Sequence, residues 1–79
     1  MNIEDFIENI EAEFDDIIPG KLKPESNLNE IFDWHDENEK KMIKMLYNEY
    51  EVMLSLKDFK NSLTFQDLYN KVLAKAAKR

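Results

Sequence analysis

The side chains with the most chemical potential lie around one histidine near the middle of the chain. His35 is the sole histidine, and it stands among the carboxylates of Asp33, Asp36, Glu37 and Glu39. One histidine with carboxylates can bind a divalent cation, but this spacing matches no standard metal motif, and the central glycine of a calcium-binding loop is missing. We therefore expect a solvated histidine in an acidic segment and no metal site.

Catalytic nucleophiles are scarce in this sequence. Cysteine is absent, which also excludes disulfides and zinc–thiolate sites, and no serine stands close to His35. An activated nucleophile needs a base within hydrogen-bond reach, and a chain of 79 residues offers little room for a catalytic pocket. We predict that the protein is not an enzyme.

The charge distribution restricts the possible partners. The net charge is −6, and the stretch from Glu4 to Asp16 holds seven acids and no base, whereas the end from Lys71 to Arg79 is basic. Net negative charge repels phosphate backbones, so we expect no nucleic-acid ligand. The acidic stretch is either a solvated helix face or a surface that steers basic partners.

Hydropathy favours a small soluble domain. No apolar run approaches the roughly 20 residues that cross a bilayer. The first ten residues carry acids where a secretory signal has bases. We expect one domain over 1–79, a monomer in the cytoplasm, with no membrane span.

Helical periodicity begins near the start of the chain. Apolar residues at spacings of three and four predict a first helix from Ile3 to Ile17, with Asn2 as its N-cap and a stop at Pro19-Gly20. The predicted apolar face consists of Ile3, Phe6, Ile7, Ile10, Phe14 and Ile17.

A long polar connection, Lys21 to His35, should then lead to the second helix. A loop of this length in a small domain is usually functional or pinned to the core, and its apolar side chains predict pinning. These side chains are Leu28, Ile31, Phe32 and Trp34. We expect Trp34 to seal the loop, and its alternative role is a partly exposed anchor for a partner.

The second helix is predicted from Asp36 to Tyr50. Acids precede bases along it, which suits the helix dipole and favours the pairs Asp36–Lys40 and Glu37–Lys41. Its predicted apolar stripe is Met42, Ile43, Leu46, Tyr47 and Tyr50. Met45 is expected in the core as well.

The remaining chain predicts an extended segment, one short helical turn at 57–60 and a last helix. Thr64 and Asp67 form a variant capping box at the start of that helix. Its predicted apolar face is Phe65, Leu68, Tyr69, Val72, Leu73 and Ala76. The fold class is therefore all-α: a small bundle of three main helices with a short third helix and a long first loop.

This order of elements resembles the acyl and peptidyl carrier proteins over residues 3 to about 76. Carriers have apolar anchors in the long loop, in many cases a tryptophan before the second helix, an aromatic and acidic end to that helix, and a threonine cap on the last one. The matching residues here are Leu28, Ile31, Asp33, Trp34, Leu46, Tyr50, Glu51, Val52, Leu54, Thr64, Asp67 and Leu68.

The resemblance also implies a chemistry that this chain lacks. Carriers of fatty-acid or polyketide synthesis hold acyl groups on 4′-phosphopantetheine, attached to the serine of an Asp-Ser-Leu motif that opens the second helix. His35, Asp36 and Glu37 occupy the three motif positions, and Lys40 replaces a commonly apolar residue. A carboxylate lacks the hydroxyl that forms the phosphodiester, so we expect no phosphopantetheine and no other cofactor.

Asp36 has two interpretations. Aspartate is among the best N-cap residues, and this structural role is the simpler one. Alternatively, its charge imitates the phosphate of a loaded carrier at the positive end of the helix.

Three functions follow as hypotheses. The first is a carrier-like protein that carries nothing and binds proteins, such as carrier-dependent enzymes, through Trp34, His35, Asp36, Glu37, Lys40, Lys41 and Lys44. The second is a genuine carrier that is modified at a non-standard residue. The third is an unrelated helical bundle with a structural or regulatory role. A simple up-down path of the chain, without the short third helix, would favour this hypothesis.

Overall fold

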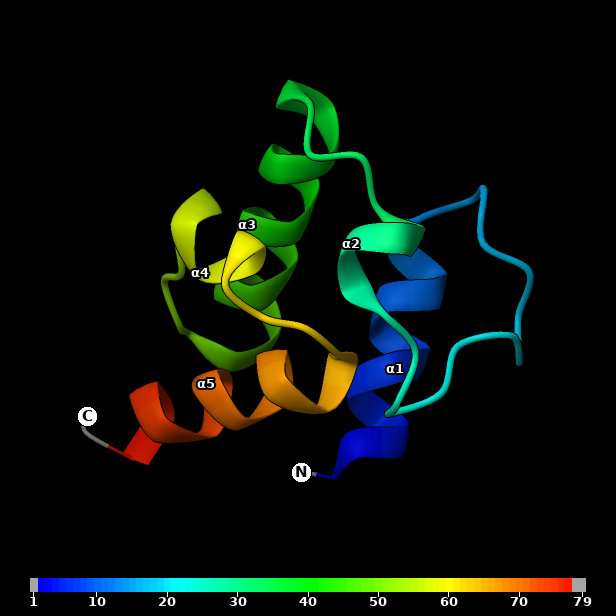
Figure 1. The fold of residues 1–79 in the computed structure, drawn as a ribbon. Helices are drawn as coiled ribbons and strands as arrows, with labels where there is room; N and C mark the ends of the chain where they lie inside the picture. The colour runs from blue at the N-terminus through cyan, green and yellow to red at the C-terminus, as the bar shows by residue number, and fades with distance from the viewer. Residues whose placement is uncertain (1, 78–79) are drawn as a thin grey trace.

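The computed structural model describes residues 2–77, apart from the side chain of Asp36. Three long and two short helices make up this part of the chain, and it contains no strand beyond a single antiparallel bridge between Asn27 and Thr64 (Figure 1). The predicted all-α class is therefore confirmed. The helices are α1 (Ile3–Glu13), α2 (Leu28–Ile31), α3 (Asp36–Tyr50), α4 (Leu56–Lys60) and α5 (Phe65–Ala77). Within residues 2–77, no helix has the length and apolar character needed to cross a membrane.

Helix α1 begins where the sequence predicts and ends earlier. The Asn2 side chain caps it by accepting the Asp5 N–H at 2.8 Å, but Phe14 already has an extended backbone. The prediction of a helix to Ile17 was therefore wrong. No basic residue stands in the last turn, and acids follow directly, which opposes continuation at the negative end of the helix dipole. Phe14 is nevertheless buried, so the apolar pattern was correct where the helix end was not.

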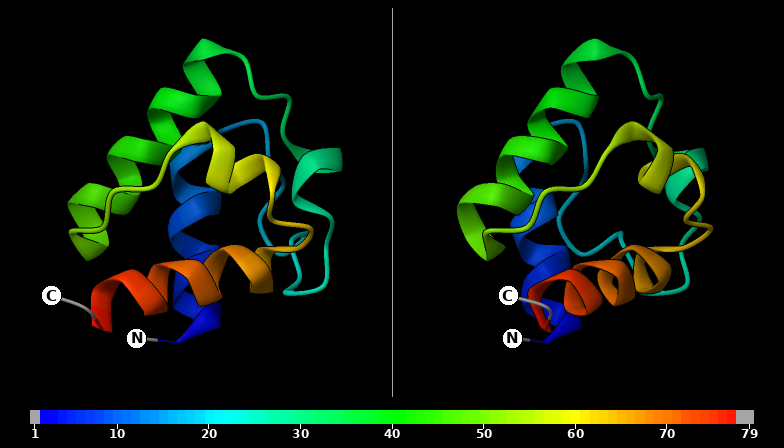
Figure 2. Two further views of the ribbon diagram at one scale, coloured as in Figure 1. Left: turned by 60° about the vertical axis from the view of Figure 1, so that its left-hand side comes forward. Right: turned by 90° about the vertical axis from the view of Figure 1, so that its left-hand side faces the viewer.

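The long connection is pinned to the rest of the molecule, as predicted. Backbone bonds join it to the segment before α5: Leu28 N–H donates to the Leu63 carbonyl at 2.9 Å, and Gln66 N–H donates to the Pro24 carbonyl at 2.9 Å. Figure 2 shows these two segments side by side in both views. The sequence did not predict α2. Its N-cap is Asn27, whose side chain accepts two backbone N–H groups of the first turn.

One of the four expected loop anchors points outward. Leu28 and Phe32 are buried and Trp34 is half-buried, but Ile31 is 45% exposed. Phe32 N–H donates to the Leu28 carbonyl, and both of these side chains are buried. Because α2 is a single turn and its C-cap Phe32 already has an extended backbone, the regular helical spacing does not bring Ile31 into the core with them.

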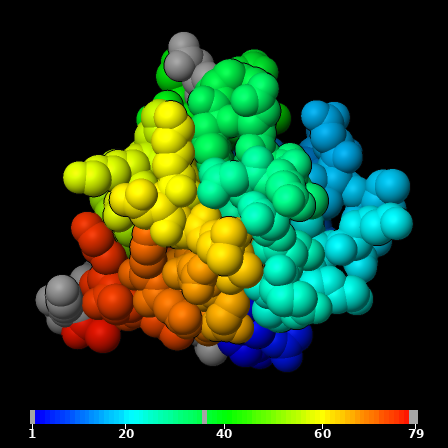
Figure 3. Space-filling view, in the orientation of Figure 1, coloured from blue at the N-terminus to red at the C-terminus, as the bar shows by residue number. Residues whose placement is uncertain are grey.

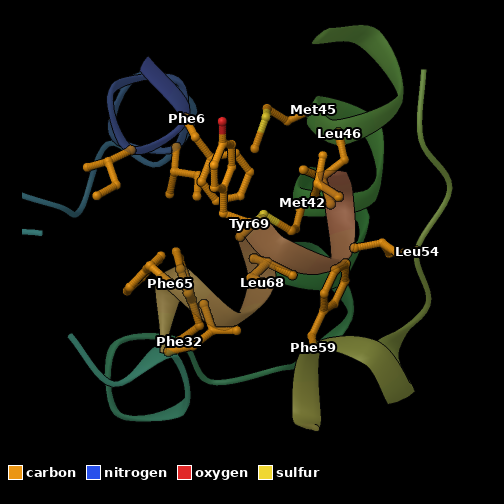
Figure 4. Close-up of a cluster of buried hydrophobic side chains, with 14 of the residues drawn as sticks. Phe6, Phe32, Met42, Met45, Leu46, Leu54, Phe59, Phe65, Leu68 and Tyr69 are labelled. Atoms are coloured by element: carbon orange, nitrogen blue, oxygen red, sulfur yellow. The ribbon is translucent and has the colours of Figure 1, made fainter. Parts of the chain in front are cut away.

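Helix α3 has the predicted bounds, but its buried face is rotated about the helix axis relative to the predicted apolar stripe. Met42, Met45 and Leu46 are buried, whereas Tyr47, predicted for the apolar stripe, is 54% exposed. Figure 4 shows the three buried side chains directed into the core shared with α5. The helix ends at Tyr50, and its C-cap Glu51 has a left-handed backbone that turns the chain out of the helix. The Glu51 N–H still donates to the Tyr47 carbonyl at 2.9 Å.

A group of aromatic rings joins the three long helices. Phe6 of α1 lies 5.8 Å from the Tyr50 ring of α3 and 5.1 Å from the Tyr69 ring of α5, centroid to centroid. Asn9 Nδ2 donates to the Tyr50 hydroxyl at 2.8 Å, and burial raises the pKa of that phenol above its ordinary value. This group fixes how α3 and α5 pack on α1.

The short turn and the capping box of the last helix are both present. Asp67 N–H donates to Thr64 Oγ1 at 3.1 Å, and Thr64 N–H donates to the Asp67 carboxylate at 3.2 Å. Of the predicted face of the last helix, Phe65, Leu68, Tyr69 and Val72 are buried, Ala76 is partly buried, and Leu73 is 38% exposed. Helix α4 is the short turn, extended by Leu56 at its start.

Asp58 in α4 organises the start of that helix and its contact with α5. Its carboxylate accepts the Ser55 N–H at 2.9 Å and the Ser55 hydroxyl at 3.1 Å. Its carbonyl oxygen accepts the Ser62 hydroxyl at 2.8 Å and Lys71 Nζ at 3.0 Å. The backbone hydrogen bond from Ser55 is the main reason that the pKa of the Asp58 carboxyl lies below its ordinary value of 3.8.

We predict that Asp58→Asn lowers the free energy of unfolding at neutral pH, by about 1 kcal/mol, a typical cost for the loss of a helix cap. A lowered folded-state pKa stabilises the fold above the ordinary carboxyl pKa, and this stabilisation is lost as the pH falls through the folded-state value. The difference in the free energy of unfolding between the parent protein and the variant should therefore become smaller at acidic pH. Urea unfolding followed by circular dichroism at neutral and acidic pH measures it, and a pH-independent difference would contradict the prediction.

Candidate functional site

The candidate site is the start of α3, which stands at the top of the molecule in Figure 1. His35 has an extended backbone, and its carbonyl accepts the Glu39 N–H at 3.1 Å, the first hydrogen bond of the helix. His35 N–H and Asn38 Nδ2 both donate to the Asp33 carbonyl, at 2.8 Å each. Residues 33–38 therefore form a tight turn that leads into the helix.

The N-cap of α3 is His35, so the prediction that Asp36 caps the helix was wrong. Asp36 is the first helical residue, one position after the cap, because the backbone turns into the helix only after His35. The structure does not describe the side chain of Asp36, so the hydrogen bond predicted for it as a cap lies outside the described part of the chain. The exposed His35 ring makes no capping bond to the described backbone, and its Nε2 lies 3.5 Å from Asn38 Nδ2.

Trp34 holds the loop in place immediately before this turn. Its ring stacks on Phe59 of α4, with centroids 4.8 Å apart and planes at 23°, and lies 5.2 Å from the Phe32 ring. Its indole N–H donates to Asn29 Oδ1 at 2.7 Å. These contacts agree with the loop-sealing interpretation, while the ring stays only half-buried.

Exposed charged side chains follow along one face of α3. Residues three and four apart are neighbours on a helix, so Glu37, Lys40, Lys41 and Lys44 form one row, which we call the α3 stripe. With three lysines and one glutamate, its net charge is +2, in a chain whose net charge is −6. Lys41 Nζ also lies 5.9 Å from the centroid of the Phe14 ring, a weak cation–π contact.

The structure brings most of the described side chains predicted to bind a partner together on one surface, and it places one of them elsewhere. His35, Glu37, Lys40, Lys41 and Lys44 are exposed at the turn and on the α3 stripe. Trp34 faces α4 instead. Among the described side chains, no three of the histidine, aspartate or glutamate type come together as a metal-binding cluster.

All four aliphatic hydroxyl groups of the chain take part in local hydrogen bonds. Ser26 Oγ accepts the Lys23 N–H at 3.0 Å, and Thr64 caps α5. Ser55 and Ser62 both donate to Asp58, and Ser62 is buried. None of them opens α3, where the family resemblance places the modified serine.

Sequence reasoning missed the role of the loop asparagines. Asn29 accepts a hydrogen bond from the Trp34 indole N–H through Oδ1 and donates through Nδ2 to the Ser62 carbonyl at 3.0 Å. It thus joins the loop to the segment after α4. A signal was available for Asn27, because an asparagine before an apolar pair three residues apart, Leu28 and Ile31, is typical of a helix cap.

Two pockets are found away from the start of α3, between α1, the loop and α2. One has a volume of about 260 Å³ and the other about 390 Å³, and Leu22 borders both. Neither touches residues 34–44. The start of α3 is instead a corner at the top of the molecule in Figure 1, with the exposed side chains of the α3 stripe beside it.

We predict that Trp34→Ala lowers the free energy of unfolding by about 2 kcal/mol, less than for a fully buried tryptophan because the ring is half-exposed. Trp34→Phe keeps ring packing and loses the bond to Asn29, so its cost should be about 1 kcal/mol. Urea unfolding followed by circular dichroism measures both. The control is Tyr47→Ala at an exposed aromatic residue, and an equal loss there would contradict a special role for Trp34.

Comparison with known proteins gives no relative from which a function could be transferred. The chain matches no family model, no curated protein and no solved structure. A function therefore has to be argued from the residues and their arrangement.

Proposed function

We propose that this protein is an acyl-carrier-like domain that carries no phosphopantetheine and acts by binding other proteins. One observation carries the proposal: the residue that opens α3 is Asp36, which has no hydroxyl group. The resemblance places the attachment serine of a carrier at this position, so we infer that the nucleophile is missing here. The available side chains do not fit the prosthetic group.

The path of the chain supports the carrier part of the proposal. A pinned loop delivers residue 36 to the start of α3, and the short α4 precedes α5. A simple up-down bundle would lack both features. This order of helices is what the resemblance to carriers implies.

The α3 stripe supports the binding part. Its lysines are exposed, and a partner that contacts this row should offer acidic groups, because complementary charge steers encounter and fixes orientation. In the carrier family the second helix is the usual recognition element. The positive stripe therefore predicts partners whose docking surfaces differ from the basic surfaces that suit acidic carriers.

The alternative is a genuine carrier modified at an unusual residue. The hydrogen bonds of Ser26, Ser55, Ser62 and Thr64 favour structural roles for all four hydroxyls. Ser55 is the exposed one among the serines, yet its modification would disturb the cap of α4.

We predict that the parent protein keeps its mass after incubation with a phosphopantetheinyl transferase and coenzyme A, as measured by intact mass spectrometry. The positive control is the triple variant His35→Asp, Asp36→Ser and Glu37→Leu, which restores the motif and should gain the mass of one arm. A mass gain by the parent would refute the proposal and favour the alternative.

We predict that the binding of partner proteins requires the lysines of the α3 stripe. In a pull-down from the native cell lysate, Lys40→Glu with Lys44→Glu should remove the specific partners, whereas Lys57→Glu with Lys60→Glu, an equal charge change on α4, should keep them. Lys41 is left unchanged because it contacts Phe14. The absence of specific partners, or equal losses with both pairs, would count against the proposal.

The two interpretations of Asp36 can be separated with the same partners. If its charge imitates a phosphate, Asp36→Ser and Asp36→Ala should both weaken binding while leaving the fold intact. Undiminished binding by both variants would leave Asp36 with a local role at the start of the helix.

A further inference from the structure

We propose that the two pockets beside α1 form a second docking surface, for a basic amphipathic segment of another protein. This surface lies away from the α3 stripe, and the inference does not depend on the proposed function. It follows from the combination of exposed aliphatic side chains and acidic neighbours at one place.

The larger pocket has an apolar lining that remains accessible. Ile17, Ile18, Leu22 and Ile31 line it, and Ile18 and Ile31 are 64% and 45% exposed. These come from the end of the α1 region, the loop and α2, so the pocket exists only because the loop is pinned. In Figure 3 these segments, in blue to turquoise, form the right-hand side of the molecule.

The smaller pocket continues this surface along α1. Leu22 borders both pockets, and Ile7 and Pro24 add apolar surface to the smaller one. An occupant that follows α1 can therefore place one aliphatic side chain on each side of Leu22.

The acids around the two pockets determine the charge of the occupant. Five acids and two lysines line them, which gives a local net charge of −3: Glu4, Glu8, Glu11, Asp16 and Glu30 against Lys21 and Lys23. Glu4 and Glu8 are exposed, and Glu11 accepts the Gly20 N–H at 2.8 Å, which holds the loop at the pocket. Lysine or arginine side chains on the occupant would meet these carboxylates, while its aliphatic side chains fill the pockets.

The probe for this surface is a synthetic amphipathic helix with a leucine stripe and lysines elsewhere. The measurements are isothermal titration calorimetry and amide chemical-shift mapping on the isotope-labelled full chain. We expect binding that weakens with added salt, with shifts centred on Ile17, Ile18, Leu22 and Ile31. A peptide with glutamates in place of the lysines should not bind.

Matched variants test the acidic and the apolar parts separately. Glu4→Gln with Glu8→Gln should weaken binding several-fold, whereas Glu37→Gln with Glu49→Gln, the same charge change on α3, should have little effect. Ile18→Asn with Ile31→Asn should weaken binding about tenfold or more, and Met53→Asn with Leu63→Asn provides the control at equally exposed apolar residues. Circular dichroism checks that each variant is folded.

Three results would overturn the proposal. The first is an unchanged spectrum with the lysine peptide at low ionic strength. The second is a set of shifts centred on α3 or α5 instead of the pockets. The third is an equal loss of affinity in the control pairs, which would show general attraction between a basic peptide and an acidic protein.

Discussion

A row of aromatic rings holds the irregular part of this molecule in place. Phe14 lies 4.6 Å from Phe32, which contacts Trp34, which stacks on Phe59. The row starts just after α1, passes through the end of α2 and the following loop, and ends on α4. Such ring pairs add about 0.5–1.5 kcal/mol each beyond the burial of their surface. The row acts together with buried Leu28, the backbone bonds to the segment before α5 and the side-chain bonds of Asn29 and Glu11 to place the long loop. Both the start of α3 and the pockets beside α1 depend on that placement.

Local signals explain why some elements could be predicted from the sequence. The bounds of α3 follow from the periodicity of its apolar residues. The cap of α5 follows from Thr64 and Asp67, which interact within a single turn. The end of α1 was missed because Phe14 and Ile17 continue the apolar spacing after the backbone has left the helix. Helix α2 was missed because four residues are too few to show a period.

Other features depend on contacts between distant parts of the chain. Met45 is buried and Tyr47 is exposed because of where α1 and α5 lie against α3. The apolar pattern of α3 alone does not determine this. The exposure of the lysines on α3 was accessible to sequence reasoning, because lysines are rarely buried. The stacking of Trp34 on Phe59 was not, since nothing local links the two residues. The fold and the identity of residue 36 are separable for the same reason, because buried residues far apart in the sequence determine the fold and do not depend on which residue opens α3.

The position of Trp34 gives the protein an intrinsic optical reporter. It is the sole tryptophan of the chain, and it lies at the junction of the loop with α4. Its fluorescence emission should therefore respond when this junction loosens, even while the helices remain intact. Local opening of the loop and global unfolding can then be distinguished in the unlabelled protein, by comparing emission with helix content under the same conditions.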